Sequence, residues 1–129
     1  MKEITTREDI ELLIKEFYSK VSQDENLGYI FNDVIKINWD RHIPNLVNFW
    51  ETILLDKFSY HNNTMGVHFD VNQKIKLEPI HFRTWLTLFD ATVDEYFQGE
   101  KAELAKKRAH LIGDLMQLKM EEINKGLTQ

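Results

Sequence analysis

The chain contains no cysteine among its 129 residues, so it carries neither a disulfide framework nor a thiolate metal site. It also lacks an uninterrupted apolar run of about 18 residues, the length that a membrane-spanning helix needs. The formal net charge of −5 argues against a duplex-binding protein, which needs a basic face to neutralise phosphates. Residues 1–6 form no hydrophobic signal region. We therefore expect a cytoplasmic protein that binds neither nucleic acid nor membranes.

Motifs of the common cofactor-free enzymes are also missing. The sequence has no nucleophile elbow, no phosphate-binding glycine loop, no GxGxxG and no HExxH pattern. No pair of histidines stands at the close spacing of a helical zinc site. Unaided hydrolytic chemistry is therefore disfavoured, and a functional site has to be assembled from dispersed residues.

The chain contains many apolar and aromatic side chains. Hydrophobic residues make up 43% of the sequence and aromatic residues 12%, with three tryptophans and eight phenylalanines. A chain of this length fits one domain, which we expect to span residues 1–129. The composition favours a core built around large flat side chains.

Apolar residues recur at helical spacing near the N-terminus. Thr6 is expected to cap a first helix, with Asp9 as its capping-box partner, and the helical pattern continues to Val21. Residues 24–28 break the pattern, and a short helix is expected around residues 29–35.

Asn38 or Asp40 is expected to cap the next predicted helix, which runs to about Leu55. Pro44 falls close to its start, within about the first turn, where the missing backbone N–H is least costly. Residues 56–77 are mostly polar and show no helical pattern. Loops of this length in a compact domain are usually functional or disordered.

Two long helices are expected in the C-terminal half. One begins at Pro79 and extends to about Phe97, and Gly99 separates it from another over residues 101–124. Gly126 is the expected C-terminal cap of the last helix. Because no alternating strand pattern occurs, the predicted fold class is all-α, with about five helices.

Two histidines, His42 and His68, bracket the third predicted helix, and a flat apolar cofactor could lie between them. His42 stands four residues before Leu46 and shares its helix face, although a histidine near a helix start is often a surface residue. His61 and His81 are alternatives to His68, because spacing alone does not choose among them.

Tyr18 and Trp85 are polar aromatic residues within apolar helical stripes. Each can be a simple core residue, yet the hydroxyl and the indole N–H need a hydrogen-bond partner when they are buried. A haem site needs apolar surroundings, an imidazole to bind the iron and hydrogen-bond donors for a diatomic ligand. Tyr18, Trp85 and the histidines could together supply these groups.

Several separated motifs occur in the order typical of one family. On these motifs the chain resembles the group III truncated haemoglobins over roughly residues 8–115. The residues that carry the resemblance are Phe17-Tyr18, Leu27-Gly28-Tyr29-Ile30-Phe31, Trp39-Asp40-Arg41-His42, Phe49-Trp50, Tyr60 with His68, and His81-Phe82-Arg83-Thr84-Trp85-Leu86-Thr87-Leu88-Phe89.

The resemblance implies a truncated globin fold, in which two pairs of helices form a two-over-two sandwich around one haem b. It places the proximal iron ligand at His68 and the distal, ligand-stabilising residues at Tyr18, His42 and Trp85. His81 resembles a packing or surface position and not the ligand.

The resemblance also implies which residues contact the cofactor. The expected haem contacts, besides the iron ligand, are Phe31, Leu46, Phe49 and Trp85. The expected function is binding of O₂, NO or CO at a pentacoordinate iron. A distal side rich in donors suits redox chemistry of O₂, NO or peroxide, such as NO dioxygenase-like or peroxidase-like activity. The chain shows no fused reductase domain, so such turnover would need an external reductase.

Two alternatives stay open from the residues alone. The protein could be a haem-based sensor or a haem-handling protein, in which His42 also binds iron. It could instead be a helical interaction module without haem, whose aromatic residues only form a core. The expected oligomeric state is a monomer or a weak dimer.

Overall fold

The computed structural model describes residues 2–34, 39–55 and 77–128. Within these ranges it contains the helices α1 (Arg7–Gln23), α2 (Trp39–Leu55), α4 (Pro79–Tyr96) and α5 (Glu100–Thr128), and a π-helical turn η1 (Ile30–Val34). The described part of the chain has no β-strand, only an isolated bridge between Lys2 and Phe97. The predicted all-α class is therefore confirmed.

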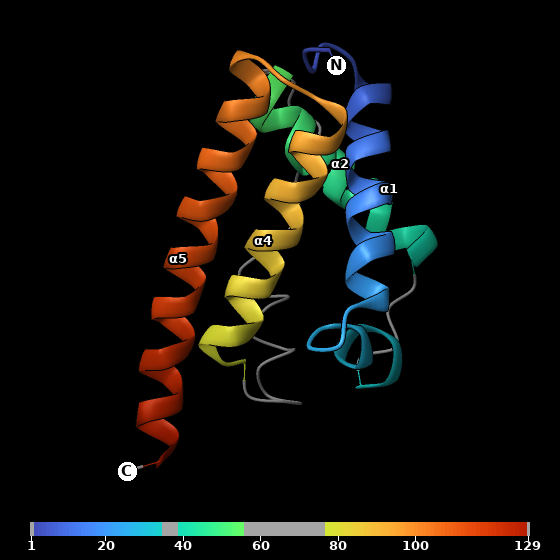
Figure 1. Cartoon of the computed structure of the whole chain (residues 1–129). Coiled ribbons are helices and arrows are strands. Elements are labelled where there is room, and N and C mark those ends of the chain that lie inside the picture. Colours follow the sequence, from blue (N-terminus) through green and yellow to red (C-terminus); the bar gives the residue numbers. More distant parts are fainter. Residues whose placement is uncertain (1, 35–38, 56–76, 129) are drawn as a thin grey trace.

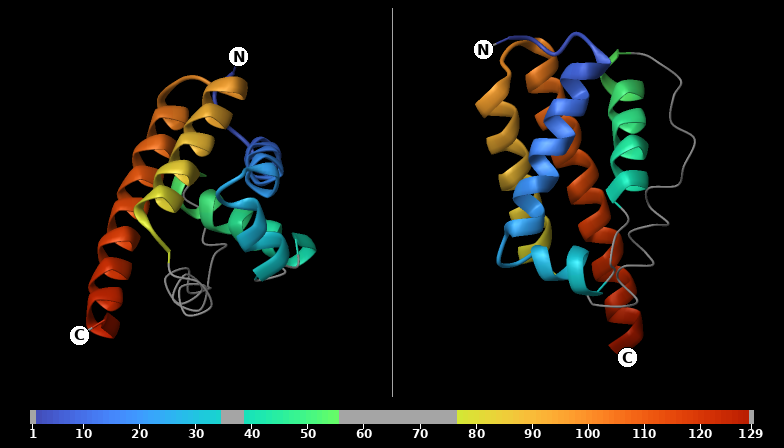
Figure 2. Two further views of the ribbon diagram at one scale, coloured as in Figure 1. Left: turned by 60° about the horizontal axis from the view of Figure 1, so that its bottom comes forward. Right: turned by 90° about the vertical axis from the view of Figure 1, so that its right-hand side faces the viewer.

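The helices pack as two layers of two. Helices α4 and α5 run antiparallel beside each other, and α1 and α2 cross one another on the other side of the molecule (Figure 1). Helix α1 also packs on α4, and α2 also packs on α5, so both layers contribute to one core. The C-terminal part of α5 extends beyond the other helices, as two further views show (Figure 2). This is the predicted two-over-two sandwich.

The core is formed by the apolar faces that the helical spacing predicts. Six residues of α1 are buried, namely Ile10, Leu13, Ile14, Phe17, Tyr18 and Val21. Aromatic rings join the layers, because Phe17 of α1 and Trp50 of α2 both contact Phe89 of α4, with centroid distances of 5.1 and 5.0 Å. None of the described helices is both long and apolar enough to cross a membrane.

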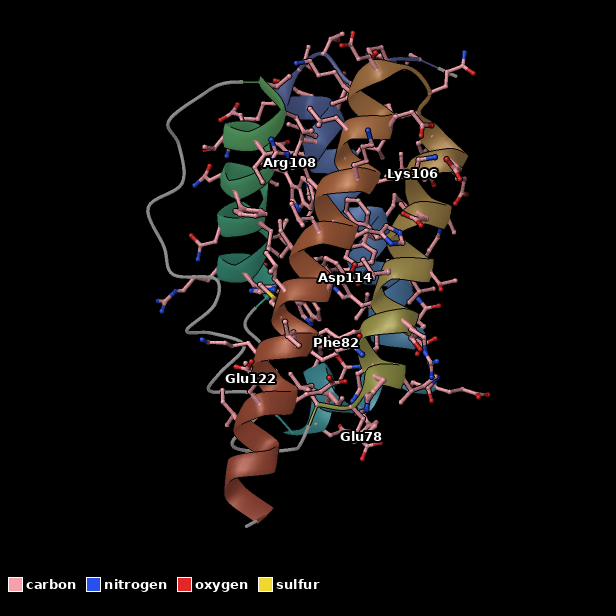
Figure 3. The ribbon with its side chains drawn as sticks, turned by 90° about the vertical axis from the view of Figure 1, so that its left-hand side faces the viewer. Glu78, Phe82, Lys106, Arg108, Asp114 and Glu122 are labelled. Atoms are coloured by element: carbon pink, nitrogen blue, oxygen red, sulfur yellow. The ribbon has the colours of Figure 1, made fainter. Side chains whose placement is uncertain are left out.

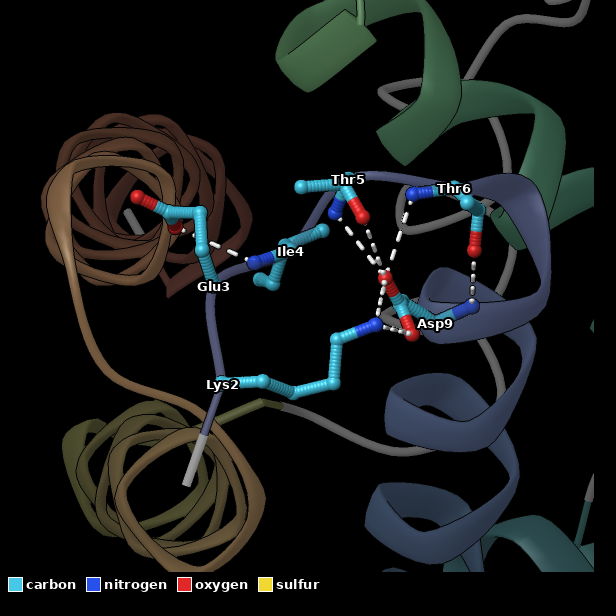
Figure 4. A network of polar contacts seen from close by, with 6 residues as sticks. All are labelled: Lys2, Glu3, Ile4, Thr5, Thr6 and Asp9. Atoms are coloured by element: carbon cyan, nitrogen blue, oxygen red, sulfur yellow. Dashed lines mark hydrogen bonds and ion pairs between the residues drawn. The ribbon is translucent and has the colours of Figure 1, made fainter.

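The start of α1 follows from local chemistry. Thr6 is the N-cap and Asp9 completes the capping box, as predicted. The Asp9 carboxylate also accepts hydrogen bonds from the backbone N–H groups of Thr5 and Thr6 and from the Lys2 ammonium (Figure 4). Partial burial acts to raise the pKa of Asp9, but these donors outweigh it and lower the pKa to about 2.

Glu3 ties the N-terminal segment to the start of α5. Its Oε1 accepts hydrogen bonds from the backbone N–H groups of Lys101 (2.9 Å) and Ala102 (3.3 Å), two donors that no residue of α5 can satisfy. Gly99 permits this approach, since its φ is +114° and an added Cβ would lie 2.5 Å from the Glu3 carboxylate.

Replacing Glu3 by Ala is therefore expected to lower the free energy of unfolding by about 1–2 kcal/mol, because it leaves the first turn of α5 uncapped. Urea denaturation of the wild type and the variant measures this difference. Glu25→Ala is the control, since Glu25 lies exposed in the turn after α1. Equal effects of the two substitutions would contradict the capping role of Glu3.

Helix α2 begins at Trp39, which agrees with the predicted start after Asn38, and Pro44 lies in its second turn. Its missing N–H leaves the carbonyl of Asp40 without the usual partner, a cost that apolar packing of α2 offsets. Helix α5 continues through Gly126 to Thr128. Gly126 therefore lies inside α5 and does not cap its end.

Candidate functional site

Tyr18 places a polar side chain within the apolar core. Helix α1 places it one residue after Phe17, within the core, where 6% of its surface is exposed. Burial raises the pKa of Tyr18 to about 12, and a hydrogen bond from the Trp85 side chain partly opposes that rise. The side chain is therefore a neutral phenol at physiological pH, with its hydroxyl proton in place.

Three rings from η1 and α2 surround the Tyr18 ring. Its centroid lies 5.4 Å from that of His42, 5.4 Å from that of Trp39 and 6.2 Å from that of Phe31. The His42 ring meets the Tyr18 ring nearly at a right angle, with an interplanar angle of 85°. We refer to Tyr18, Phe31, Trp39, His42 and Trp85 as the Tyr18 cluster.

Trp85 reaches the same hydroxyl from the opposite layer. It lies on α4, packs edge-on against Phe17 at 5.3 Å and stacks on Phe89 at 5.8 Å. The Trp85 side chain acts to lower the pKa of Tyr18, so its polar N–H edge is directed toward that hydroxyl. The two side chains are more than sixty residues apart in the sequence.

Helix α2 has two apolar faces. One is buried in the core and contains Val47, Trp50 and Leu54. The other contains the predicted cofactor contacts Leu46 and Phe49, which are half-buried and pack against the core. Helix α2 is therefore apolar on more than its core-facing side.

Comparison with known proteins decides the family. No family model matches the chain. A curated relative, the group 3 truncated haemoglobin Ctb of Campylobacter jejuni subsp. jejuni serotype O:2, is 31% identical over 121 residues, which cover 89% of this chain and 91% of the relative. The crystal structure of a group III truncated haemoglobin from Campylobacter jejuni superposes with a TM-score of 0.78 at 31% identity, covering 93% of this chain and 95% of that chain. The chain belongs to the group III truncated haemoglobins.

Membership of this family implies a globin fold, a haem cofactor and the binding of diatomic gases. The described residues of this truncated haemoglobin fit a haem. Phe31, Leu46, Phe49 and Trp85 are half-buried apolar side chains from three elements, as the face of a macrocycle requires. The Tyr18 hydroxyl is a neutral donor within the same aromatic group, which suits a polar diatomic ligand.

The structure brings together most, but not all, of the residues that the sequence singles out. Tyr18, His42 and Trp85, the three predicted distal residues, belong to one cluster and come from α1, α2 and α4. The predicted iron ligand His68 and its neighbour His61 lie outside the described residues. The assignment of His68 therefore stays a prediction from the family resemblance.

The remaining histidines of this truncated haemoglobin have structural partners. His81 Nδ1 accepts a hydrogen bond of 2.8 Å from the backbone N–H of Glu78, which caps the start of α4. His110 Nε2 lies 2.6 Å from a carboxylate oxygen of Asp90 on the outer side of α4 and α5. Both side chains are thus occupied away from the Tyr18 cluster, which agrees with a packing or surface role for His81.

Trp39 is the member of the cluster to which the sequence analysis assigned no role. Its ring lies 5.8 Å from that of His42 and 6.1 Å from that of Phe31, in addition to its contact with Tyr18. A signal existed in the sequence, because Trp39 stands three residues before His42 and therefore shares its helix face.

The raised pKa of Tyr18 predicts a loss of stability in alkali. An unfolded tyrosine ionises near pH 10, whereas Tyr18 in the folded protein keeps its proton to about pH 12. The contribution of Tyr18 to the free energy of unfolding is therefore complete below pH 10 and is lost between pH 10 and pH 12. The expected loss is on the order of 2–3 kcal/mol. Denaturation of the wild type and of Tyr18→Phe across this range measures it. Parallel pH profiles of the two proteins would contradict the burial of an un-ionised Tyr18.

Proposed function

We propose that this truncated haemoglobin binds O₂, or the related ligands NO and CO, at a pentacoordinate iron of haem b. When bound, haem supplies an iron atom that takes up a diatomic gas and exchanges electrons. In this proposal His68 holds the iron on the proximal side, and Tyr18, His42 and Trp85 face the ligand on the distal side. The observation that carries the proposal is the buried Tyr18 side chain within a cluster of aromatic rings.

The role of Tyr18 follows from its hydrogen bonding. The Tyr18 side chain is buried and keeps its proton, so its hydroxyl can donate a hydrogen bond to a ligand. A hydrogen bond to a partially charged acceptor contributes on the order of 1.5–3 kcal/mol. Tyr18 is therefore the donor expected to slow ligand release most.

His42 has a different proposed role. Its ring packs on Tyr18 and Trp39 near the start of α2, and it is only half-buried. A side chain at such a boundary can turn between solvent and the interior. We therefore assign it to gating ligand entry and not to iron ligation.

A donor-rich distal side holds a polar ligand firmly, which suits chemistry on the ligand better than its transport. The proposed activity is therefore redox conversion of O₂, NO or peroxide, in an NO dioxygenase-like or peroxidase-like manner. An external reductase would supply the electrons. Consumption of NO by the oxygenated protein, measured with and without an added reductant, tests this part of the proposal.

The coordination of ferrous iron without added ligand tests the proposed role of His42. The absorption spectrum of the reduced protein is expected to be that of five-coordinate haem, and His42→Ala is expected to leave it unchanged. His110→Ala is the matched control, because His110 pairs with Asp90 on the outer surface. A six-coordinate spectrum that becomes five-coordinate only in His42→Ala would point to a haem-based sensor or a haem-handling protein.

A further inference from the structure

Helix α5 carries a row of exposed leucines on the face that points away from the core. Leu111, Leu115 and Leu118 are 52%, 54% and 57% exposed, more than any other large hydrophobic residue of the described ranges. The opposite face of α5 packs into the core through Ala105, Ala109, Met116 and Met120. Three large apolar side chains in one row on a solvent-facing helix are a feature of interaction surfaces.

The row has the spacing of a helix-pairing seam. Arg108, Leu111, Leu115, Leu118 and Glu122 follow one another at intervals of three and four residues, the pattern by which two helices pack along a common line. We call these five residues the α5 seam. Arg108 and Glu122 lie along one edge of α5, whereas Lys106 lies on the other side, toward α4 (Figure 3). The seam therefore consists of an apolar centre with one charge at each end.

The charges at the two ends are free to pair with another molecule. Within the described part of the chain, neither Arg108 nor Glu122 forms an ion pair, whereas the nearby Lys106 pairs with Asp94 and Glu103. Arg108 stands seven residues before Leu115 and Glu122 stands seven residues after it, so opposite charges lie at equal distances from the centre. This symmetry is what a surface that binds its own copy requires.

We propose that the α5 seam is the interface of a weak antiparallel homodimer with its twofold axis at Leu115. In this arrangement Leu115 meets its own copy, and Leu111 of each chain meets Leu118 of the other. Arg108 of each chain meets Glu122 of the other.

The flanking charges support the same orientation. Lys107 of one chain lies opposite Glu121 of the other, while Asp114 on the flank faces its own copy. Arg108–Glu122 and Lys107–Glu121 each occur twice in the dimer, which gives four attractive contacts against one repulsive contact between the two Asp114 side chains. A parallel arrangement would instead place like charges together at both ends of the seam. The seam is short, about 21 Å along the helix, so the dimer is expected to form only at roughly 10–100 µM protein.

Sedimentation of the haem-loaded protein over a range of concentrations tests the proposal. The wild type is expected to change from monomer to dimer, and Leu115→Glu is expected to raise the dissociation constant by about a hundredfold or more, because it places two carboxylates at the twofold axis. Leu12→Glu is the matched control, since Leu12 is an exposed leucine on α1. A wild type that stays monomeric at all concentrations, or equal effects of the two substitutions, would overturn the proposal.

A charge exchange tests the antiparallel register without touching the leucines. Arg108→Glu is expected to weaken the dimer by roughly tenfold through two like-charge contacts, and the added change Glu122→Arg is expected to restore it. Failure of the second change to restore dimerisation would mean that these residues do not face each other. If the chain instead stays monomeric and sediments with phosphatidylglycerol vesicles in a Leu115-dependent manner, the face binds lipid and the dimer is wrong.

Discussion

Replacement of Tyr18 by Phe is expected to speed the release of O₂ from the reduced protein by about ten- to a hundredfold. The substitution removes the hydroxyl while it keeps the ring, which packs against Phe31, Trp39 and His42. The lost hydrogen bond to a partially charged acceptor corresponds to on the order of 1.5–3 kcal/mol, and each 1.4 kcal/mol is a factor of about ten. Stopped-flow displacement of O₂ by CO measures the dissociation rate.

Two controls separate this hydrogen bond from a general disturbance. Tyr29→Phe removes a hydroxyl from a side chain that is 43% exposed, and it is expected to leave the rate unchanged. Trp85→Phe is expected to speed release by a smaller factor, because it removes the polar N–H that acts on Tyr18. The double variant is expected to be less than additive, since both side chains act through one chain of hydrogen bonds. An unchanged rate in Tyr18→Phe would mean that Tyr18 does not contact the ligand.

Replacement of His68 by Ala is expected to abolish the native ligation of iron, whereas His81→Ala is expected to preserve it. His81 Nδ1 already accepts the Glu78 N–H at the start of α4, so its imidazole serves the helix. The His81 variant should therefore lose about 1 kcal/mol of stability while its absorption spectrum stays that of the wild type. Spectra of the ferric, reduced and CO-bound forms of both variants measure the two outcomes.

A variant that loses its spectrum could also have lost its fold. His68→Gly in the presence of free imidazole resolves this, because imidazole can occupy the space of the missing side chain and bind the iron. Return of the native spectrum with imidazole is the expected result. Native ligation in His68→Ala without imidazole would show that another histidine binds the iron.

The sequence predicts well those features that depend on neighbouring residues. The start of α1 rests on Thr6 and Asp9, which are three residues apart, and the break before α5 rests on Gly99. Both were predicted correctly, because capping and a positive φ are local properties. Gly126 was placed wrongly for the converse reason. It disfavours a helix interior by local preference, yet α5 continues through it.

The site shows where local reasoning stops. Spacing could align His42 with Leu46, but it could not show that Trp85 of α4 acts on Tyr18 of α1, because that depends on how the two helices pack. Nor could spacing exclude His81 as the iron ligand. Its hydrogen-bond partner is the backbone N–H of Glu78 at the start of α4, which the sequence does not reveal. The choice of His68 depends on the family to which the chain belongs, and not on any property of its neighbours.

Titration of the purified chain with haem tests the central claim most directly. The account predicts an intense Soret band that rises until one haem is bound per chain, and then no further. In this account haem covers the half-buried apolar side chains Phe31, Leu46 and Phe49. If no stoichiometric haem binds, the aromatic cluster around Tyr18 is only a core, and the haem-binding function is contradicted.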